Sequence, residues 1–149
     1  MEILVIEDDE HKFSEMESLI RNCAPQSRIC RSLSLVEARK SIRDHLYDLV
    51  IIDMAIPSHT PEKGEGAPIS LLNGGIDIVL EISLSQRDDR CVIVTQYPDI
   101  EISGDFFPVN AARSELARKL QCEVEACIYY EHNSEAWKGE LKKLIGETE

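Results

Sequence analysis

The sequence predicts a doubly wound α/β domain, in which helices cover both faces of one parallel sheet. Strand candidates recur five times along the chain, and all but a weaker one are short, continuous apolar runs, which is typical of strands buried on both faces. Segments with apolar residues three and four positions apart separate them, as in amphipathic helices. Strands that alternate with helices in this way pair in parallel through right-handed crossovers. The length of 149 residues fits a single domain, 1–149.

The first strand is expected at residues 3–6, where an apolar run ends at the three acids of residues 7–9. A helix follows, which Pro25 ends, and its apolar stripe consists of Phe13, Met16, Ile20 and Cys23. Residues 28–32 form a weaker strand candidate. Ser34 and Glu37 then have the spacing of a capping box, which begins the second helix.

Residues 49–52, Leu-Val-Ile-Ile, make the most strand-like run of the chain and end abruptly at Asp53. Residues 54–73 are rich in proline and glycine and show little periodicity, which predicts a long inserted loop. Loops of this length are usually functional or disordered. A partner-binding or site-covering role and a tolerated insertion therefore both stay open.

The second half of the chain repeats the alternation of helices and strands. Strands are expected at residues 91–95 and 126–130, and residues 97–108 are expected to be irregular. Apolar stripes predict the remaining helices, through Ile76, Val79, Leu80 and Ile82, then Ala112, Leu116, Ala117 and Leu120, then Trp137, Leu141, Leu144 and Ile145. The complete pattern predicts a five-stranded, flavodoxin-like parallel sheet.

Composition excludes several classes of function. With 28 acidic and 16 basic side chains, the net charge of −12 disfavours nucleic acid and anionic lipid as partners. No apolar run approaches the roughly 20 residues of a membrane span, and the N-terminus lacks a secretory signal, so we expect a cytoplasmic protein. The four histidines are scattered without the spacing of a zinc site, and surface positions are expected for them.

Three acids gather at the ends of two predicted strands. Glu7 and Asp8 follow the first strand and Asp53 follows the third, and ligands bind flavodoxin-like sheets between these two strand ends. Because three close carboxylates repel one another, such a cluster generally needs a cation. Oxygen ligands favour Mg²⁺, whose remaining coordination positions can hold phosphate oxygens. The alternative is that acids at strand ends cap the next helix or are simply solvated.

These residues carry a resemblance to a known family. Ile-Leu-Val-Ile-Glu-Asp at 3–8, Leu-Val-Ile-Ile-Asp-Met-x-x-Pro at 49–57 and Val-Ile-Val-Thr at 92–95 resemble the receiver domain of bacterial response regulators. The resemblance implies that Asp53 accepts a phosphoryl group from a sensor histidine kinase. It also implies that Mg²⁺ is held by Glu7, Asp8, Asp53 and the carbonyl of Ala55, and that the Thr95 hydroxyl contacts the phosphoryl group.

The sequence departs from the family at the end of the fifth strand. Receivers usually have a lysine there that pairs with the phosphoryl group, and here the position falls on Glu131 or His132. Because neither side chain is a lysine ammonium, phosphorylation or its transmission is expected to be weakened.

Three functions compete. The first is a non-enzymatic signalling domain that is phosphorylated on Asp53 and acts through protein contacts, as in two-component systems. The second is a pseudo-receiver, an interaction module in a larger assembly that works without phosphorylation. The third is a Mg²⁺-dependent phosphatase, which Ala55 disfavours because such enzymes typically have an acid at that position.

Overall fold

The computed structural model describes residues 1–60, 70–71 and 74–148. Five strands form the main sheet in the order β2-β1-β3-β6-β9, and all four neighbouring pairs are parallel. They are β1 (Glu2–Ile6), β2 (Arg28–Ser32), β3 (Leu49–Ile52), β6 (Arg90–Thr95) and β9 (Ala126–Tyr129). The predicted five-stranded flavodoxin-like sheet is therefore confirmed.

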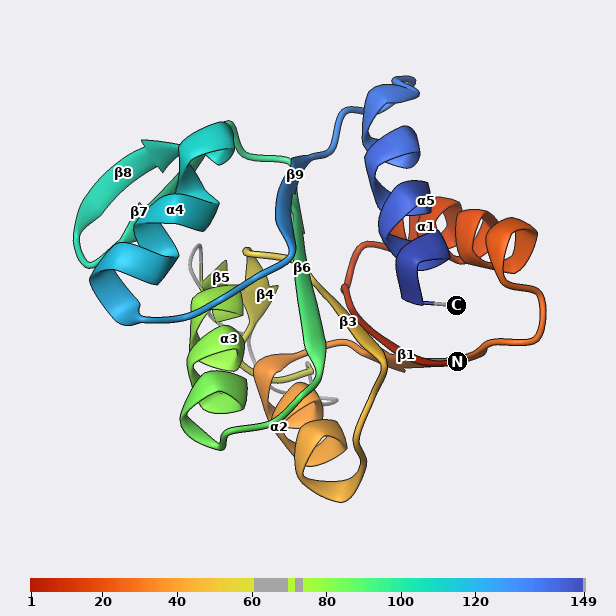
Figure 1. The fold of residues 1–149 in the computed structure, drawn as a ribbon, viewed down its shortest axis with the longest axis horizontal. Coiled ribbons are helices and arrows are strands. Elements are labelled where there is room, and N and C mark those ends of the chain that lie inside the picture. Colours follow the sequence, from red (N-terminus) through yellow and green to blue (C-terminus); the bar gives the residue numbers. More distant parts are fainter. Residues whose placement is uncertain (61–69, 72–73, 149) are drawn as a thin grey trace.

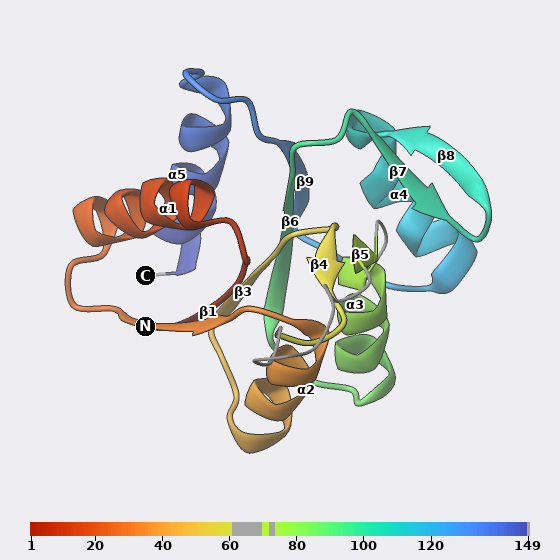
Figure 2. The same ribbon diagram turned by 180° about the vertical axis from the view of Figure 1, so that it is seen from behind.

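Helices cover both faces of this sheet (Figures 1 and 2). One face carries α1 (Glu10–Cys23) and α5 (Ala136–Thr148), and the other carries α2 (Leu35–Asp44), α3 (Gly74–Leu84) and α4 (Val109–Leu120). Alternate residues of β1 divide between the two layers: Ile3 and Val5 pack with the first, Leu4 and Ile6 with the second. Both faces are buried, which explains why the strands have continuous apolar sequences rather than alternating ones.

One segment differs from its expectation. Residues 97–108 were predicted to be irregular, and that prediction is wrong, because β7 (Asp99–Ile102) and β8 (Asp105–Pro108) form an antiparallel hairpin. Ser103 and Gly104, both with positive φ, make its two-residue turn, the backbone conformation that suits the twist of paired strands. Ile100 and Ile102 of β7 are both buried in the core. The sequence thus has the alternation of buried and exposed residues that is typical of a strand, but only over four residues.

The predicted loop at 54–73 is only partly covered by the described residues. Two short strands, β4 (Ile56–Pro57) and β5 (Ser70–Leu71), pair antiparallel at its ends. Residues 61–69 and 72–73 lie outside the described residues, and the role of the loop stays open. Among the helices that the structure describes, none has both the length and the apolar character of a membrane span.

A buried ion pair ties the start of β6 to the end of α2. Asp89, whose side chain is inaccessible, accepts hydrogen bonds from Tyr47 N at 2.8 Å and Arg87 Nε at 2.7 Å. Arg87 also donates to the carbonyl of Ile42. Burial raises the pKa of Asp89, but hydrogen bonds from Arg87 and Tyr47 outweigh that effect and lower it below 3.8.

We expect Asp89→Ala to lower the free energy of unfolding by about 3 kcal/mol, because it leaves a partly buried guanidinium and the amide of Tyr47 without their acceptor. A lowered pKa stabilises the fold above the unfolded-state value near 3.8 and is lost as pH falls. The difference from wild type should therefore shrink in urea unfolding below about pH 4. Exposed Asp88→Ala is the matched control, and an equal loss in both variants would contradict this role.

Candidate functional site

The predicted acids meet where β1 and β3 end. The two strands are neighbours, Ile6 pairs with Ile52, and the amide of Asp53 donates to the carbonyl of Ile6 at 3.0 Å. Each strand is followed directly by its acid, so the pairing brings Glu7 and Asp53 side by side. Carboxylate oxygens of Glu7, Asp8 and Asp53 lie within 4.8 Å of one another. Glu7 and Asp53 are 1% and 7% exposed, whereas Asp8 is exposed.

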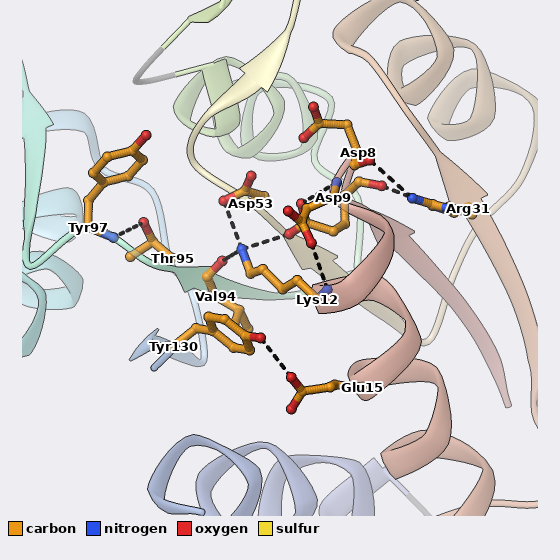
Figure 3. A network of polar contacts seen from close by, with 11 residues as sticks. Asp8, Asp9, Lys12, Glu15, Arg31, Asp53, Val94, Thr95, Tyr97 and Tyr130 are labelled. Carbon is orange, nitrogen blue, oxygen red and sulfur yellow. Dashed lines mark hydrogen bonds and ion pairs between the residues drawn. The ribbon is translucent and has the colours of Figure 1, made fainter. Parts of the chain in front are cut away.

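Arg31 holds the acidic turn that follows β1. Its guanidinium donates to the carbonyls of Glu7 at 3.0 Å and Asp8 at 3.3 Å, and it pairs with Glu10 at 2.8 Å. Arg31 belongs to the neighbouring edge strand β2 (Figure 3). Its hydrogen bonds therefore hold the backbone of Glu7 and Asp8 against the sheet.

Asp9 caps α1. Its carboxylate accepts from the amide of Lys12 at 2.8 Å, as expected of an N-cap residue. Asp9 therefore has the helix-capping role that was the alternative for acids at strand ends. Glu7, Asp8 and Asp53 instead form the expected cluster. The cap also fixes the first turn of the helix, and with it the direction of the Lys12 side chain.

A buried lysine completes the site, and no motif in the sequence indicates it. Lys12 Nζ lies 3.0 Å from Asp53 Oδ1, 2.9 Å from the carbonyl of Val94 and 2.7 Å from Glu7 Oε2 (Figure 3). The residue is 2% exposed, and the ring of Tyr130 lies 5.6 Å from the ammonium. The contact with Glu7 is an ion pair, because this oxygen accepts no directed hydrogen bond from the described residues.

The spacing of residues along α1 indicates that Lys12 is buried. The buried residues of this helix are Lys12, Met16 and Ile20, which follow one another at intervals of four. Positions four apart lie on the same helical face, so Lys12 extends the apolar stripe toward the sheet. A charged residue on a buried face needs a partner of opposite charge.

Burial shapes the ionisation of the two central acids. Burial, helped by the charge of Asp53, outweighs the opposing effect of the Lys12 ammonium, and the net result raises the pKa of Glu7 to about 7. Burial also raises the pKa of Asp53, and Lys12 opposes that rise. Both groups therefore depend on a nearby positive charge to ionise at neutral pH.

Thr95 and Ala55 are the remaining predicted residues of the site. Thr95 is fully buried at the end of β6, and its hydroxyl accepts from the amide of Tyr97 at 3.2 Å. Ala55 follows two residues after Asp53, and its amide hydrogen bond lowers the pKa of that carboxyl. Gly75 packs against this turn, where an added Cβ would lie 2.6 Å from the carbonyl of Asp53.

Glu131 and His132, the positions where the family lysine was expected, are both exposed after the end of β9. The Nδ1 of His132 lies 3.0 Å from His11 Nε2. Neither residue brings a positive charge to the acids. The ammonium that lies next to Asp53 comes from Lys12 of α1.

A parallel sheet of this order, with acids at the ends of its first and third strands, is the arrangement found in receiver domains. Solved receiver domains have the same fold. One is the response regulator TrrA from Thermotoga maritima, determined in complex with Mg²⁺-BeF, which is 22% identical with a TM-score of 0.61. The match covers 96% of this chain and 97% of that chain. The fold of the chain is therefore that of a receiver.

Proteins with similar sequences identify the family within the receiver class. The Detocs response regulatory protein DtcB of Vibrio alginolyticus is 34% identical, over 96% of this chain and 98% of its own length. The DtcB of Enterobacter cloacae is 23% identical over 99% of both chains. No protein-family model matches the sequence. The chain belongs to the family of response regulators of two-component signalling that includes the DtcB proteins.

Proposed function

We propose that this receiver accepts a phosphoryl group on Asp53 from the phosphohistidine of a sensor kinase, and that it signals through protein contacts. The observation that carries the proposal is the environment of Asp53. Its carboxylate lies at the end of a central strand, with a buried ammonium on Oδ1 and two further acids alongside. A carboxylate placed in this way is a nucleophile beside groups that can balance the charge of a phosphoryl group.

The transfer needs only one exchange of bonds. An oxygen of Asp53 forms a bond to phosphorus, and the P–N bond of the phosphohistidine breaks. Its electron pair returns to the imidazole of the donor. The Thr95 hydroxyl, at the same edge of the sheet, would contact an oxygen of the transferred group after turning from the Tyr97 amide.

The acids fit Mg²⁺. Glu7 Oε2 is buried without a directed hydrogen bond from the described residues, and Asp8 has no basic side-chain partner among them. Glu7, Asp8 and Asp53, with the carbonyl of Ala55, would hold the ion, and Mg²⁺ prefers such oxygen ligands. When bound, Mg²⁺ shields the charge that develops on the transferring phosphoryl group. TrrA, which has the same fold, was solved with Mg²⁺-BeF.

Several expectations about partners belong to the same proposal. The net charge of −12 disfavours nucleic acid and anionic membrane surfaces, which leaves proteins as partners. A sensor histidine kinase is the expected donor, and the cytoplasm is the expected location. The domain would act as a phosphorylated signal rather than as an enzyme.

The test is the intact mass of the protein after incubation with a small acyl phosphate and Mg²⁺. Wild type should gain one phosphoryl group, and Asp53→Asn, which keeps the shape of the side chain but removes the nucleophile, should gain none.

Three results would contradict the proposal. Persistent label in Asp53→Asn would move the acceptor to another residue. An unlabelled wild type that still binds its partner would favour the pseudo-receiver, and steady turnover of a phosphate ester would indicate a phosphatase.

A further inference from the structure

We propose that Lys12 is the residue that contacts the phosphoryl group, so that α1 supplies the positive charge that strand β9 lacks. This inference rests on the proposed function, because it concerns the phosphoryl group that Asp53 would carry. It assigns a role in the site to a residue from a different element and a different part of the sequence.

The position of the ammonium carries the inference. The Lys12 ammonium donates hydrogen bonds to Asp53 Oδ1 and to the carbonyl of Val94, and it forms an ion pair with Glu7 Oε2. A phosphoryl group on Asp53 would bring its oxygens close to Nζ, and one of them can replace the carboxylate oxygen as the acceptor. The contacts with the carbonyl of Val94 and with Glu7 would hold the side chain in place. No covalent bond of Lys12 forms or breaks.

Among the described residues, no other cation is placed to do this. Within residues 1–60, 70–71 and 74–148, Lys12 is the one basic side chain paired with the carboxylate of Glu7 or Asp53. Glu131 and His132 are exposed after β9, and the ring of Tyr130, the residue before them, lies beneath the Lys12 ammonium. An amphipathic explanation, in which Lys12 packs only its stem and keeps its ammonium in water, does not account for a residue that is 2% exposed.

The experiment compares Lys12→Met with wild type. Methionine fills the space of the stem but removes the charge, and Lys12→Gln is the second variant in case methionine does not fold. Exposed Lys142→Gln changes net charge equally and is the matched control. Folding is checked by circular dichroism in the presence of Mg²⁺.

Two quantities are measured: the initial rate of labelling by a small acyl phosphate, and the binding of beryllofluoride, a phosphoryl mimic, by fluorine NMR. Loss of a donor that stabilises charge in a reaction centre typically lowers the rate by about 100-fold, and we expect this loss in Lys12→Met and none in Lys142→Gln. Beryllofluoride binding should weaken in parallel.

The outcomes separate the inference from the proposed function. If wild type and Lys12→Met label at the same rate, the inference is wrong and the proposed function stands. If wild type takes no label, beryllofluoride decides, and equal binding in Lys12→Met overturns the inference. If wild type shows neither labelling nor binding, both proposals fail.

A second inference concerns the residues near the Tyr130 hydroxyl, which donates to Glu15. We infer that His11, Glu15 and His132 bind a divalent transition-metal ion, with Zn²⁺ as the probe. His11 and Glu15 are four residues apart on one face of α1, and His132 follows β9. The sequence alone did not bring these residues together.

The three ligand atoms face one point. His11 Nε2 lies 2.7 Å from Glu15 Oε1 and 3.0 Å from His132 Nδ1, and the latter lies 3.6 Å from Glu15 Oε1. Ligand atoms about 3.3 Å apart surround a tetrahedral Zn²⁺ with bonds of about 2.0–2.1 Å. Tyr130 donates to Glu15 Oε1 at 2.9 Å, an outer contact that orients a ligating carboxylate. Imidazole ligands favour Zn²⁺ over Mg²⁺.

Lys138 lies next to the proposed metal site, so its substitution tests whether a cation binds there. Its Nζ lies 3.8 Å from Glu15 Oε2 and competes with a bound cation. Zn²⁺ is titrated calorimetrically into full-length protein in excess Mg²⁺, which occupies the acids near Asp53. We expect His11→Ala and His132→Ala to weaken binding at least about 10-fold, Lys138→Gln to strengthen it, and exposed His45→Ala to leave it unchanged. Equal affinity in wild type and both histidine variants would overturn the site.

Discussion

Lys12→Met is expected to lower the free energy of unfolding by about 3–5 kcal/mol in buffer without divalent cations, because it leaves two buried carboxylates without their counter-charge. Glu7 and Asp53 are 1% and 7% exposed, and water cannot replace the ammonium at either. Urea unfolding at neutral pH measures the loss, with Lys142→Gln as the surface control.

Mg²⁺ should restore part of that stability. A cation that binds only the folded state adds about 1.4 kcal/mol at ten times its dissociation constant. The gain should be larger in Lys12→Met than in wild type, because the ammonium already neutralises part of the charge in wild type. An equal gain in both proteins would show that Lys12 and the ion act at separate places.

Trp137→Ala is expected to have the second large effect, a loss of about 3–5 kcal/mol from the cavity left in the core. Trp137 is fully buried on α5, and its ring centroid lies 5.0 Å from that of Tyr130. Thermal or urea unfolding gives the measurement.

Trp137→Phe is the matched variant. Among the described residues no acceptor receives the indole Nε1 hydrogen, so phenylalanine removes a buried donor without a partner while it keeps most of the ring. We expect it to lose much less stability than alanine. A loss as large as that of Trp137→Ala would show that the indole nitrogen is satisfied in solution.

The strands and the cluster of acids could be predicted because each signal was local. Runs such as residues 49–52 are continuous and apolar, and the acid that follows each run marks the end of a strand. Parallel pairing then brings Glu7, Asp8 and Asp53 to one edge without any further information.

The rest depended on contacts between distant elements. The hairpin of β7 and β8 has strands of four residues with two buried isoleucines, too short a pattern to identify beside longer apolar runs. Hydrophobicity alone does not identify Lys12, because a lysine is not counted in an apolar stripe. In the structure Lys12 nevertheless lies on the same buried face of α1 as Met16 and Ile20. Its role emerges only from its distance to Asp53, 41 residues away in the sequence.

Borohydride trapping identifies the residue that carries the phosphoryl group. Wild-type protein is incubated with a small acyl phosphate and Mg²⁺, reduced with borohydride and mapped by peptide mass spectrometry. An acyl phosphate on an aspartate is reduced to homoserine, whereas phosphate on histidine or serine is not. The account predicts homoserine at position 53 alone. Homoserine at Asp8 or another acid, or an unmodified position 53 in protein that carries the label, would contradict it.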